Sequence, residues 1–264
     1  MRRRTAVLVL IVLLAAAVAP VRPQQENPAP GVNQAQDILD RAIAALGGPQ
    51  FLHVQDVTRR GRLYSFDRGQ LASPGDRFVD YVKFPGKERL EIGKDGKIVY
   101  LNDNELGWEL DRQGIREMTP EQIEDFQRSN RRDLEYLLRF RVHREKMGLY
   151  YLGREFLDNR RVHLIELVDE DNQSLTLVVD AETYLPVQLR YRQRDPLSGE
   201  RANVTDHYAK YITVQGIKTP MHLTRQSNGL RTFEAYLTEV QYNAGLLDNL
   251  FTRASLEERW QKVK

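Results

Sequence analysis

Between Val54 and Tyr242 the chain is a succession of short β-type segments separated by turn signals, and this pattern restricts the fold more than any other feature. Several segments alternate apolar and polar side chains, as Leu185, Val187 and Leu189 do with the residues between them. Such alternation predicts a sheet with one buried face. Turns recur about every ten residues, which is typical of an antiparallel meander, and no long βαβ crossover is present.

The length of this pattern predicts that the sheet bends. An open sheet of roughly ten strands twists strongly enough to curl, and helices on its concave side are the simplest cover for the apolar face. We therefore expect a mainly β protein built on a single curved antiparallel sheet. If helices rather than a second sheet cover it, part of that interface can loosen, and an apolar ligand can replace some of the helical packing.

Helical periodicity replaces the β pattern near both ends of the domain. Residues 34–46 carry apolar residues at helical spacing, with Asn33 as the expected N-cap and Gly47-Gly48 as the stop. Residues 254–263 are predicted to form a short polar helix that closes the chain.

A helical block interrupts the strands over residues 120–141. It begins at Thr119 with a sequence close to a capping box, and a break is expected near Ser129-Asn130. Its apolar stripe must be buried, and consists of Ile123, Phe126, Leu134, Leu137, Leu138 and Phe140. The interleaved arginines are expected on the solvent-facing side, where they can also meet an acidic partner or lipid head groups: Arg128, Arg131, Arg132, Arg139, Arg141 and Arg144.

The N-terminus has the features of a secretory signal peptide, because three arginines precede an apolar run from Ala6 to Ala19. That run is shorter than the about 20 apolar residues that a membrane span needs. We therefore expect residues 1–24 to be a signal peptide with its cleavage region, residues 25–32 to be disordered, and residues 33–264 to form one domain. The expected product is exported, soluble and located in the periplasm.

The sequence contains no cysteine, which excludes a disulfide, a thiolate metal site and an acylated cysteine. Its 39 basic and 37 acidic residues give a formal charge of +2. Removal of Arg2, Arg3 and Arg4 with the signal peptide lowers the basic total from 39 to 36, and the charge to −1. Net charge therefore indicates neither a nucleic acid nor an acidic membrane surface as a partner.

The chain lacks the motifs of the common catalytic chemistries, with no G-x-S-x-G elbow, no H-E-x-x-H, no P-loop and no G-x-G-x-x-G. Its five histidines are far apart, and a lone strand histidine such as His163 is an ordinary sheet residue. Asp169-Glu-Asp171 lacks the spaced carboxylates of a calcium loop and is expected to be a solvated hairpin tip. We expect no catalytic residue, no metal ligand and no cofactor.

Apolar residues of successive strands are the candidates for a ligand cavity. One wide curled sheet under a few helices encloses more room than compact packing needs, although strand hydrophobes are packed core far more often than ligand contacts. The candidates are Leu90, Ile92, Val99, Leu101, Trp108 and Leu110 before the helical block, and Leu185, Val187 and Leu189 after it.

Several stretches, taken in order, resemble the LolA-like outer-membrane lipoprotein carriers. Residues 81–92 and the following Asp95-Gly-Lys97 resemble that family's strand with a proline-containing turn and its next hairpin. Leu175 to Asp180, running into Thr183-Tyr-Leu-Pro186, resembles its later hairpin. The end of the chain is similar as well, over Val240 to Asn243 and Asp248 to Phe251.

The resemblance implies an incomplete β-barrel of the LolA/LolB type, with a helical lid around residues 120–141 over an apolar cavity for lipoprotein acyl chains. The implied lid residues are Ile123, Phe126, Leu134, Leu137 and Leu138. It also implies a basic residue that controls lid opening, and Arg59, Arg60 and Arg62 lie in the corresponding region. The implied partners are an inner-membrane donor and an outer-membrane acceptor, with transient contact to a membrane surface.

The sequence therefore favours a non-enzymatic periplasmic carrier that binds lipoprotein acyl chains or another lipid and delivers it toward the outer membrane. A second interpretation is a lipoprotein-sensing regulatory or structural interaction domain of the bacterial envelope, with a filled interior and no cargo transfer. The third is a hydrolase, for which no nucleophile and base can be paired.

Overall fold

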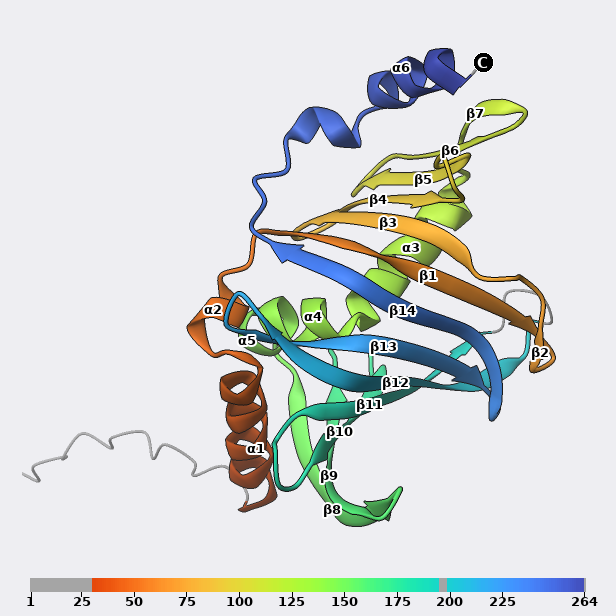
Figure 1. Cartoon of the computed structure of the whole chain (residues 1–264). Helices are drawn as coiled ribbons and strands as arrows, with labels where there is room; N and C mark the ends of the chain where they lie inside the picture. The colour runs from red at the N-terminus through yellow and green to blue at the C-terminus, as the bar shows by residue number, and fades with distance from the viewer. Residues whose placement is uncertain (1–29, 195–198, 264) are drawn as a thin grey trace, which may run out of the picture.

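The β-type segments form antiparallel strands in the computed structural model of the protein, which describes residues 30–194 and 199–263 (Figure 1). The strands before the inserted helices are β1 (Asp56–Asp67), β2 (Gln70–Leu71), β3 (Asp76–Lys83), β4 (Lys87–Ile92), β5 (Ile98–Asp103), β6 (Gly107–Asp111) and β7 (Gly114–Glu117). The strands after them are β8 (Gly148–Leu157), β9 (Arg160–Val168), β10 (Ser174–Asp180), β11 (Pro186–Arg194), β12 (Arg201–Val214), β13 (Ile217–Ser227) and β14 (Leu230–Tyr242).

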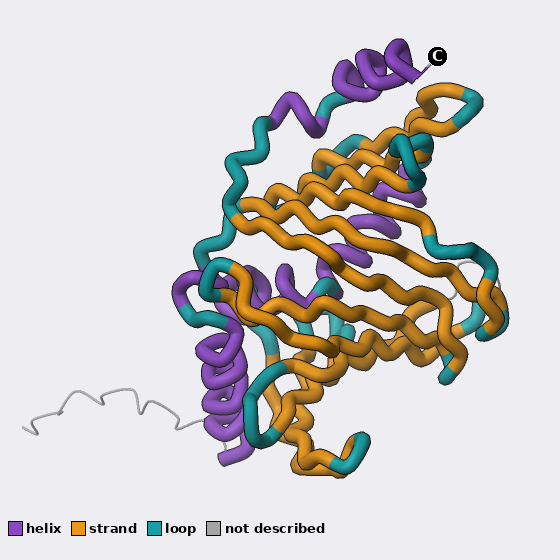
Figure 2. Tube along the Cα trace, viewed as in Figure 1, coloured by secondary structure: helices purple, strands orange, loops and turns teal. Residues whose placement is uncertain are grey.

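Within the described residues the strands form one 14-stranded sheet in the order β7-β6-β5-β4-β3-β1-β14-β13-β12-β11-β10-β9-β8, with β2 paired to β1. The two strand groups join through β1 and β14, where Val57 lies opposite Tyr242. β7 and β8 are the two ends of this order, so the sheet curves without closing (Figure 2). The predicted single curved antiparallel sheet is confirmed.

The first helix, α1 (Pro30–Leu46), begins before the expected cap Asn33 and is followed by α2 (Pro49–Leu52). Gly47 ends α1 with a φ of 131°, and a Cβ there would lie 2.9 Å from the carbonyl oxygen of Gly216. A glycine is required at this position because the backbone is left-handed and the neighbouring strand is close.

The predicted signal peptide, residues 1–24, lies outside the described residues. The same holds for most of the expected disordered segment, whose last residues, 30–32, belong to α1. None of the helices in the described part of the chain has the length and apolarity needed to cross a membrane.

The inserted block begins as predicted with α3 (Pro120–Arg132). Thr119 and Gln122 form the capping box, since the Thr119 N–H donates to Oε1 of Gln122 at 2.8 Å and the Gln122 N–H donates to Oγ1 of Thr119 at 3.3 Å. The break lies at Asp133 rather than at Ser129-Asn130, because the Asp133 carboxylate caps the next helix. The block continues as α4 (Leu134–Tyr136), the π-helix η1 (Leu137–Arg141) and α5 (Val142–Arg144).

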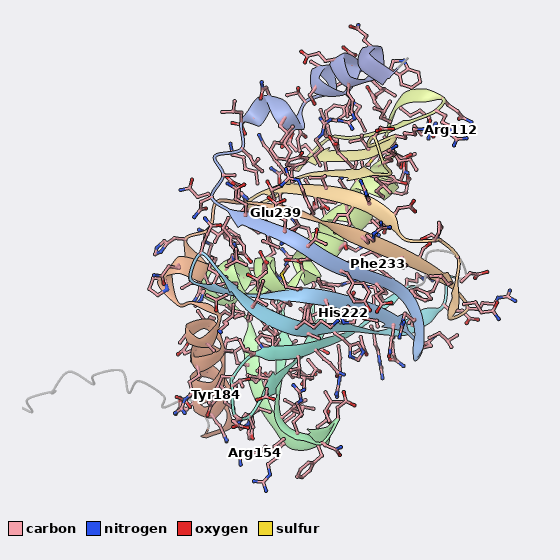
Figure 3. All side chains as sticks on the ribbon, in the orientation of Figure 1. Arg112, Arg154, Tyr184, His222, Phe233 and Glu239 are labelled. Carbon is pink, nitrogen blue, oxygen red and sulfur yellow. The ribbon has the colours of Figure 1, made fainter. Side chains whose placement is uncertain are left out.

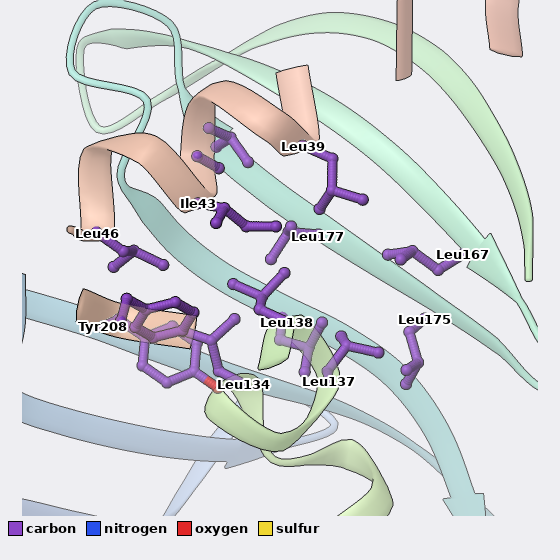
Figure 4. Packing of buried hydrophobic residues seen from close by; sticks show 14 of the residues in the cluster. Leu39, Ile43, Leu46, Leu134, Leu137, Leu138, Leu167, Leu175, Leu177 and Tyr208 are labelled. Carbon is purple, nitrogen blue, oxygen red and sulfur yellow. The ribbon is translucent and has the colours of Figure 1, made fainter. Parts of the chain in front are cut away.

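The main core lies between the sheet and the helices α1, α4 and η1. Figure 4 shows Leu137 and Leu138 among side chains of α1 and of the strands, including Leu175 and Leu177. Leu137 and Leu138 are both 0% exposed. This half of the helical block is therefore part of the core.

A smaller core lies on the opposite face of β4 to β6, under the C-terminal elements η2 (Asp248–Phe251) and α6 (Arg253–Val263). Leu256 of α6 packs there among strand residues. Arg89 of β4 anchors the same elements by donating to Oγ of Ser255 at 2.7 Å and to the carbonyl of Leu250 at 3.0 Å. The predicted C-terminal helix is confirmed, and it covers a face of the sheet.

Candidate functional site

The helix α3 lies behind β1 and β3 in Figure 1, on the side of the sheet that α4 and η1 also occupy. None of its residues is buried, although Ile123 and Phe126 are half-buried. Three amide side chains attach it to the sheet and its loops: Gln122 to Oε1 of Glu109 at 2.9 Å, Gln127 to the carbonyl of Asn104 at 2.7 Å, and Asn130 to the carbonyl of Pro85 at 3.1 Å. Polar contacts therefore hold α3 in place more than apolar burial does.

A cavity of about 200 Å³ lies between α3, the α3–α4 junction and the sheet. Its apolar walls come from β3 and the residue after it, from α3, and from β13 and β14: Val82, Phe84, Phe126, Leu223 and Phe233. Figure 3 labels Phe233 on β14. Its charged lining residues are Arg59, Glu88, Asp133, Asp206 and Arg225. The cavity is thus amphipathic, with apolar walls and two charged groups.

Arg59 of β1 is the centre of the first charged group. Its Nη1 lies 2.9 Å from Oδ2 of Asp80 on β3, and its Nη2 lies 3.1 Å from Oε2 of Glu135 on α4. The same Glu135 oxygen is 3.2 Å from Nη2 of Arg139 on η1. These ion pairs connect the sheet to the packed part of the helical block.

Arg139 is buried with a side chain that is 0% exposed, and its three guanidinium nitrogens have no hydrogen-bond acceptor among the described residues. Its guanidinium instead lies over the rings of Phe51 at 4.4 Å and Phe84 at 5.0 Å. Burial lowers the pKa of Arg139. The aromatic faces and Glu135 stabilise this cation where water cannot reach it.

More carboxyl groups than guanidinium groups meet around Arg59. Burial, and next the charge of Asp80, raise the pKa of Glu88 to about 8. Burial also raises the pKa of Asp80 and of Asp133. Burial acts on Glu135 in the same direction, but Arg59 and Arg139 hold the pKa of Glu135 below its ordinary value. Glu88 therefore carries a proton at neutral pH, and Glu135 is ionised.

Asp206 and Arg225 form the second charged group, on neighbouring strands β12 and β13. Arg225 binds Asp206 through two nitrogens, Nε at 2.6 Å from Oδ1 and Nη2 at 2.9 Å from Oδ2. The hydroxyl of Tyr191 donates to the same carboxylate at 3.2 Å. Both charges are satisfied within the sheet. Among the described residues that line the cavity, Glu88 and Asp133 are then the carboxyl groups that form no ion pair with an arginine.

Comparison with known proteins identifies the architecture. No protein-family model and no curated protein sequence matches the chain. A DUF1329 family protein from Desulfovibrio piger matches 86% of this chain and 99% of its own length, with a TM-score of 0.60 at 15% identity. A LolA superfamily protein from Nitrosomonas europaea matches 84% of this chain and 99% of its own length, with a TM-score of 0.54 at 17% identity. The chain has a LolA-like fold.

A third solved structure, a domain named for outer-membrane lipoprotein sorting from Vibrio parahaemolyticus, agrees with this assignment. It matches 86% of this chain and 98% of its own length, with a TM-score of 0.54 at 13% identity. The predicted resemblance to LolA-like proteins is confirmed at the level of the fold.

The LolA-like sheet separates the first group of predicted cavity residues onto two faces. Leu90 and Ile92 share a face with Glu88, because they alternate with Arg89 and Glu91, which contact α6 and its preceding loop. Neither lines the cavity, but both are half-buried beside it along β4. Four residues lie on the opposite face, packed with Leu256 of α6: Val99, Leu101, Trp108 and Leu110.

The second group and the lid residues lie mostly in the main core. Leu189 is fully buried there, Leu185 packs against it, and Val187 is half-buried beside the β10–β11 bulge. The lid residues Leu134, Leu137 and Leu138 are core residues as well. Of the five lid residues, Phe126 lines the cavity and Ile123 shares its helix.

The charged residues of the cavity were not among the predicted site residues. Glu88 could have been identified from the sequence, because it alternates with Leu90 and Ile92 and is the one charged residue on that face of β4. Asp206 and Arg225 had none, because a charged residue within a strand normally lies on the solvated face. Their approach to the cavity follows from the curvature of the sheet.

The three basic residues of β1 separate in the structure. Arg59 lines the cavity, Arg60 pairs with Glu239 at 3.1 Å on the exposed side, and Arg62 donates to the carbonyl of Gly75 at 3.1 Å. Arg59 is therefore the one of the three that links the sheet to the helical block.

The prediction that the arginines of residues 128–144 face solvent is wrong for Arg139 and Arg141, which are both buried. Arg141 donates to Oε2 of Glu145 at 2.9 Å and to Oδ2 of Asp169 at 2.8 Å. Asp169 is consequently a largely buried ion-pair partner at its turn, rather than part of a solvated hairpin tip. Charge pairing across the fold, which local periodicity does not encode, accounts for both corrections.

His163 lies in the interior of the fold among aromatic side chains. It is buried, its Nδ1 lies 3.1 Å from the hydroxyl of Tyr151, and its ring stacks on Tyr184. Burial lowers the pKa of His163. Among the residues that the structure describes, no three histidine, aspartate or glutamate side chains gather as a metal site would require.

Proposed function

We propose that the protein is a non-enzymatic periplasmic carrier that binds the acyl chains of a lipoprotein or another lipid between α3 and the concave face of the sheet. Three features support this: the LolA-like fold, the amphipathic cavity, and above all a helix that covers the sheet without burying any of its own residues. Displacing α3 would enlarge the cavity without opening the main core.

The proposed binding surface continues from the cavity along β4 and β5. Leu90 and Ile92 lie beside Glu88, and their cross-strand partners Tyr100 and Ile98 are exposed on the same face. An acyl chain laid on this strip gains about 0.8 kcal/mol for each methylene removed from water. The polar end of the cargo then lies at the charged groups around Arg59 and Glu88.

Delivery requires a change of affinity along the route. A cargo held by apolar burial is released when a partner protein or a movement of α3 lowers the affinity of the binding site for that cargo. In the proposed cycle an inner-membrane protein donates the lipid and an outer-membrane protein accepts it.

A titration with a fluorescent fatty acid tests the binding proposal. Leu90→Gln should weaken binding about tenfold, because it removes about one buried apolar side chain from the contact. Ile212→Gln is the matched control, since Ile212 is an exposed strand residue of β12 and lies outside the cavity lining. No measurable binding by the wild-type protein, or an equal loss in both variants, would contradict the proposal.

One observation favours a second candidate, a lipoprotein-sensing or structural interaction domain without cargo. The space under α4 and η1 is filled by Leu134, Leu137 and Leu138, and the remaining cavity of about 200 Å³ is small for a whole acyl chain. Native mass spectrometry of freshly purified protein separates the two candidates. A co-purifying lipid supports the carrier, and a stoichiometric protein partner without lipid supports the interaction domain.

A further inference from the structure

The hairpin formed by β8 and β9 carries the most exposed large apolar side chain of the described residues, Phe156, at 74%. Two more apolar residues of the same strand, Leu152 and Tyr150, are about half exposed, at 53% and 50%. β8 is the last strand in the order of the sheet. The bulge between Tyr151 and Gly153 places Tyr150 and Phe156 on opposite faces of β8. Edge strands usually carry charged or shielded positions, so the strongly exposed Phe156 at the end of this strand indicates a contact surface there.

This hairpin ends in a tight turn next to Phe156. Its turn is Asp158-Asn159, with φ values of 47° and 62°, and Leu157 pairs with Arg160 across it. Two left-handed residues in a row form the tight turn that matches the twist of the flanking strands. Further along β8, Leu149 and Tyr151 pack against the main core. The base of the hairpin is therefore part of the core, while its tip exposes Phe156.

Arg154 and Arg161 share the face of Phe156 on the hairpin tip, which we define as residues 154–161, whereas Arg160 lies on the opposite face. The tip contains the exposed residues Arg154, Arg160 and Arg161, and the guanidinium of Arg161 lies 5.8 Å from the centre of the Phe156 ring. The tip also contains two acids, Glu155 and Asp158. Glu155 is paired with Arg190 of β11 at 2.5 Å, and Nη1 of Arg160 lies 3.8 Å from Oδ2 of Asp180, so the positive charge beside the apolar ring comes from Arg154 and Arg161.

We propose that the hairpin tip docks on an anionic lipid bilayer, with the Phe156 ring at the level of the head groups and Arg154 and Arg161 against the phosphates. Aromatic side chains concentrate at membrane interfaces, and clustered arginines are attracted to anionic lipids. A protein partner fits less well, because the tip of a single hairpin offers far less than the about 800 Å² per partner of a stable protein interface.

The position of the tip fixes the orientation of the docked molecule. In Figure 3 Arg154 lies at one end of the molecule, and Arg112 and the C-terminal helix lie at the other. A protein docked by residues 154–161 therefore holds α6 and β7 away from the bilayer. The hairpin tip is separate from the cavity, so docking of the tip does not depend on whether the cavity binds a lipid.

Vesicle co-sedimentation tests the proposal, with wild type and variants sharing the same N-terminus so that their differences report on the hairpin. Wild type should bind vesicles that contain phosphatidylglycerol more tightly than vesicles of pure phosphatidylcholine. Replacing Arg154 and Arg161 by serine should weaken binding about fivefold per arginine. Phe156→Ser should weaken binding about tenfold, and Phe156→Leu should keep most of it, because leucine also inserts an apolar side chain.

Leu230→Ser is the matched control, because Leu230 is similarly exposed beside the turn of the β13–β14 hairpin. It should bind like wild type. The proposal is overturned if wild type binds neither kind of vesicle, if it binds both equally, or if the variant without Arg154 and Arg161 binds like wild type. Circular dichroism of each variant, and the fatty-acid titration run beside it, separate a loss of docking from a loss of folding or of cargo binding.

Discussion

The helices cover the two halves of the curved sheet in different ways. Over β8 to β13, the helices α1, α4 and η1 interlock with the strands, and Leu134, Leu137 and Leu138 are buried. Over the half that contains β3 and β4, α3 has no buried residue and is attached by amide hydrogen bonds. We refer to these as the packed half and the open half. One continuous helical block thus forms part of the core at one end, and at the other end covers the sheet with no buried residue.

Asp133 marks the boundary between the exposed helix α3 and the buried part of the helical block. Its backbone is extended, which ends α3, and its carboxylate accepts hydrogen bonds from the N–H groups of Glu135 and Tyr136, which begins α4. Because the hydrogen-bonded backbone is interrupted here, α3 can move while α4 stays in the core. In the carrier that we propose, access of a ligand to the cavity would therefore depend on the junction at Asp133.

The largest expected effect tests the ion pairs that hold the packed half to the sheet. Glu135→Gln should lower the free energy of unfolding by about 3–5 kcal/mol, because it leaves Arg139 buried without a counter-charge. Glu239→Gln removes the exposed partner of Arg60 and should cost under about 1 kcal/mol. Chemical denaturation measures the free energy of unfolding of both variants. Equal losses would show that the buried ion pairs stabilise the protein no more than the exposed pair does.

A core truncation in each half sharpens the comparison directly. Leu138→Ala in η1 should cost about 2–5 kcal/mol, because it opens a cavity in a fully packed site. Ile123→Ala in α3 should cost about 1 kcal/mol or less, because that side chain is only half-buried. Similar losses for the two variants in chemical denaturation would remove the distinction between the halves.

The pH dependence of stability probes the carboxyl groups under the Asp133 junction. Burial raises the pKa of Glu88 to about 8 from an ordinary 4.5, so the unfolded chain loses this proton before the folded protein does. The contribution of Glu88 is fully present below 4.5 and is lost as the pH rises toward about 8, which amounts to a few kcal/mol at most.

Glu88→Gln should remove this part of the pH dependence and make the protein more stable than wild type at alkaline pH. Denaturation on both sides of the Glu88 pKa measures it, and Glu239→Gln, whose side chain is exposed, provides the control. A variant that retains the wild-type slope would show that Glu88 is not the titrating group.

The smallest effect concerns the independence of α3. Thr119→Ala removes the capping hydroxyl and should weaken α3 by about 1 kcal/mol. Amide hydrogen exchange should then become about fivefold faster within α3, while the free energy of global unfolding changes little, because α3 opens separately from the core. Faster exchange in α4 and η1 as well would show that the two halves open together.

Much of the fold was predictable, because strands and helix ends leave local signals. The Thr119 capping box and the Gly47 stop of α1 both lie where the sequence places them. The candidate site was less predictable. Trp108 and Leu90 are both apolar strand residues, yet Trp108 packs under α6, and Leu90 lies on the face that carries the cavity.

The sequence by itself determined the alternation of each strand, the position of the turns and the start of α3, since neighbouring residues set backbone preference and periodicity. Tertiary structure alone decided which face of each strand is covered, where Arg59, Glu88 and Arg225 meet, and which end of the helical block is core. The physical reason is that a periodic pattern shows that a strand has two different faces, but it does not show which other element covers each face. Which element covers a face depends on packing and charge pairing between segments that lie far apart in the chain.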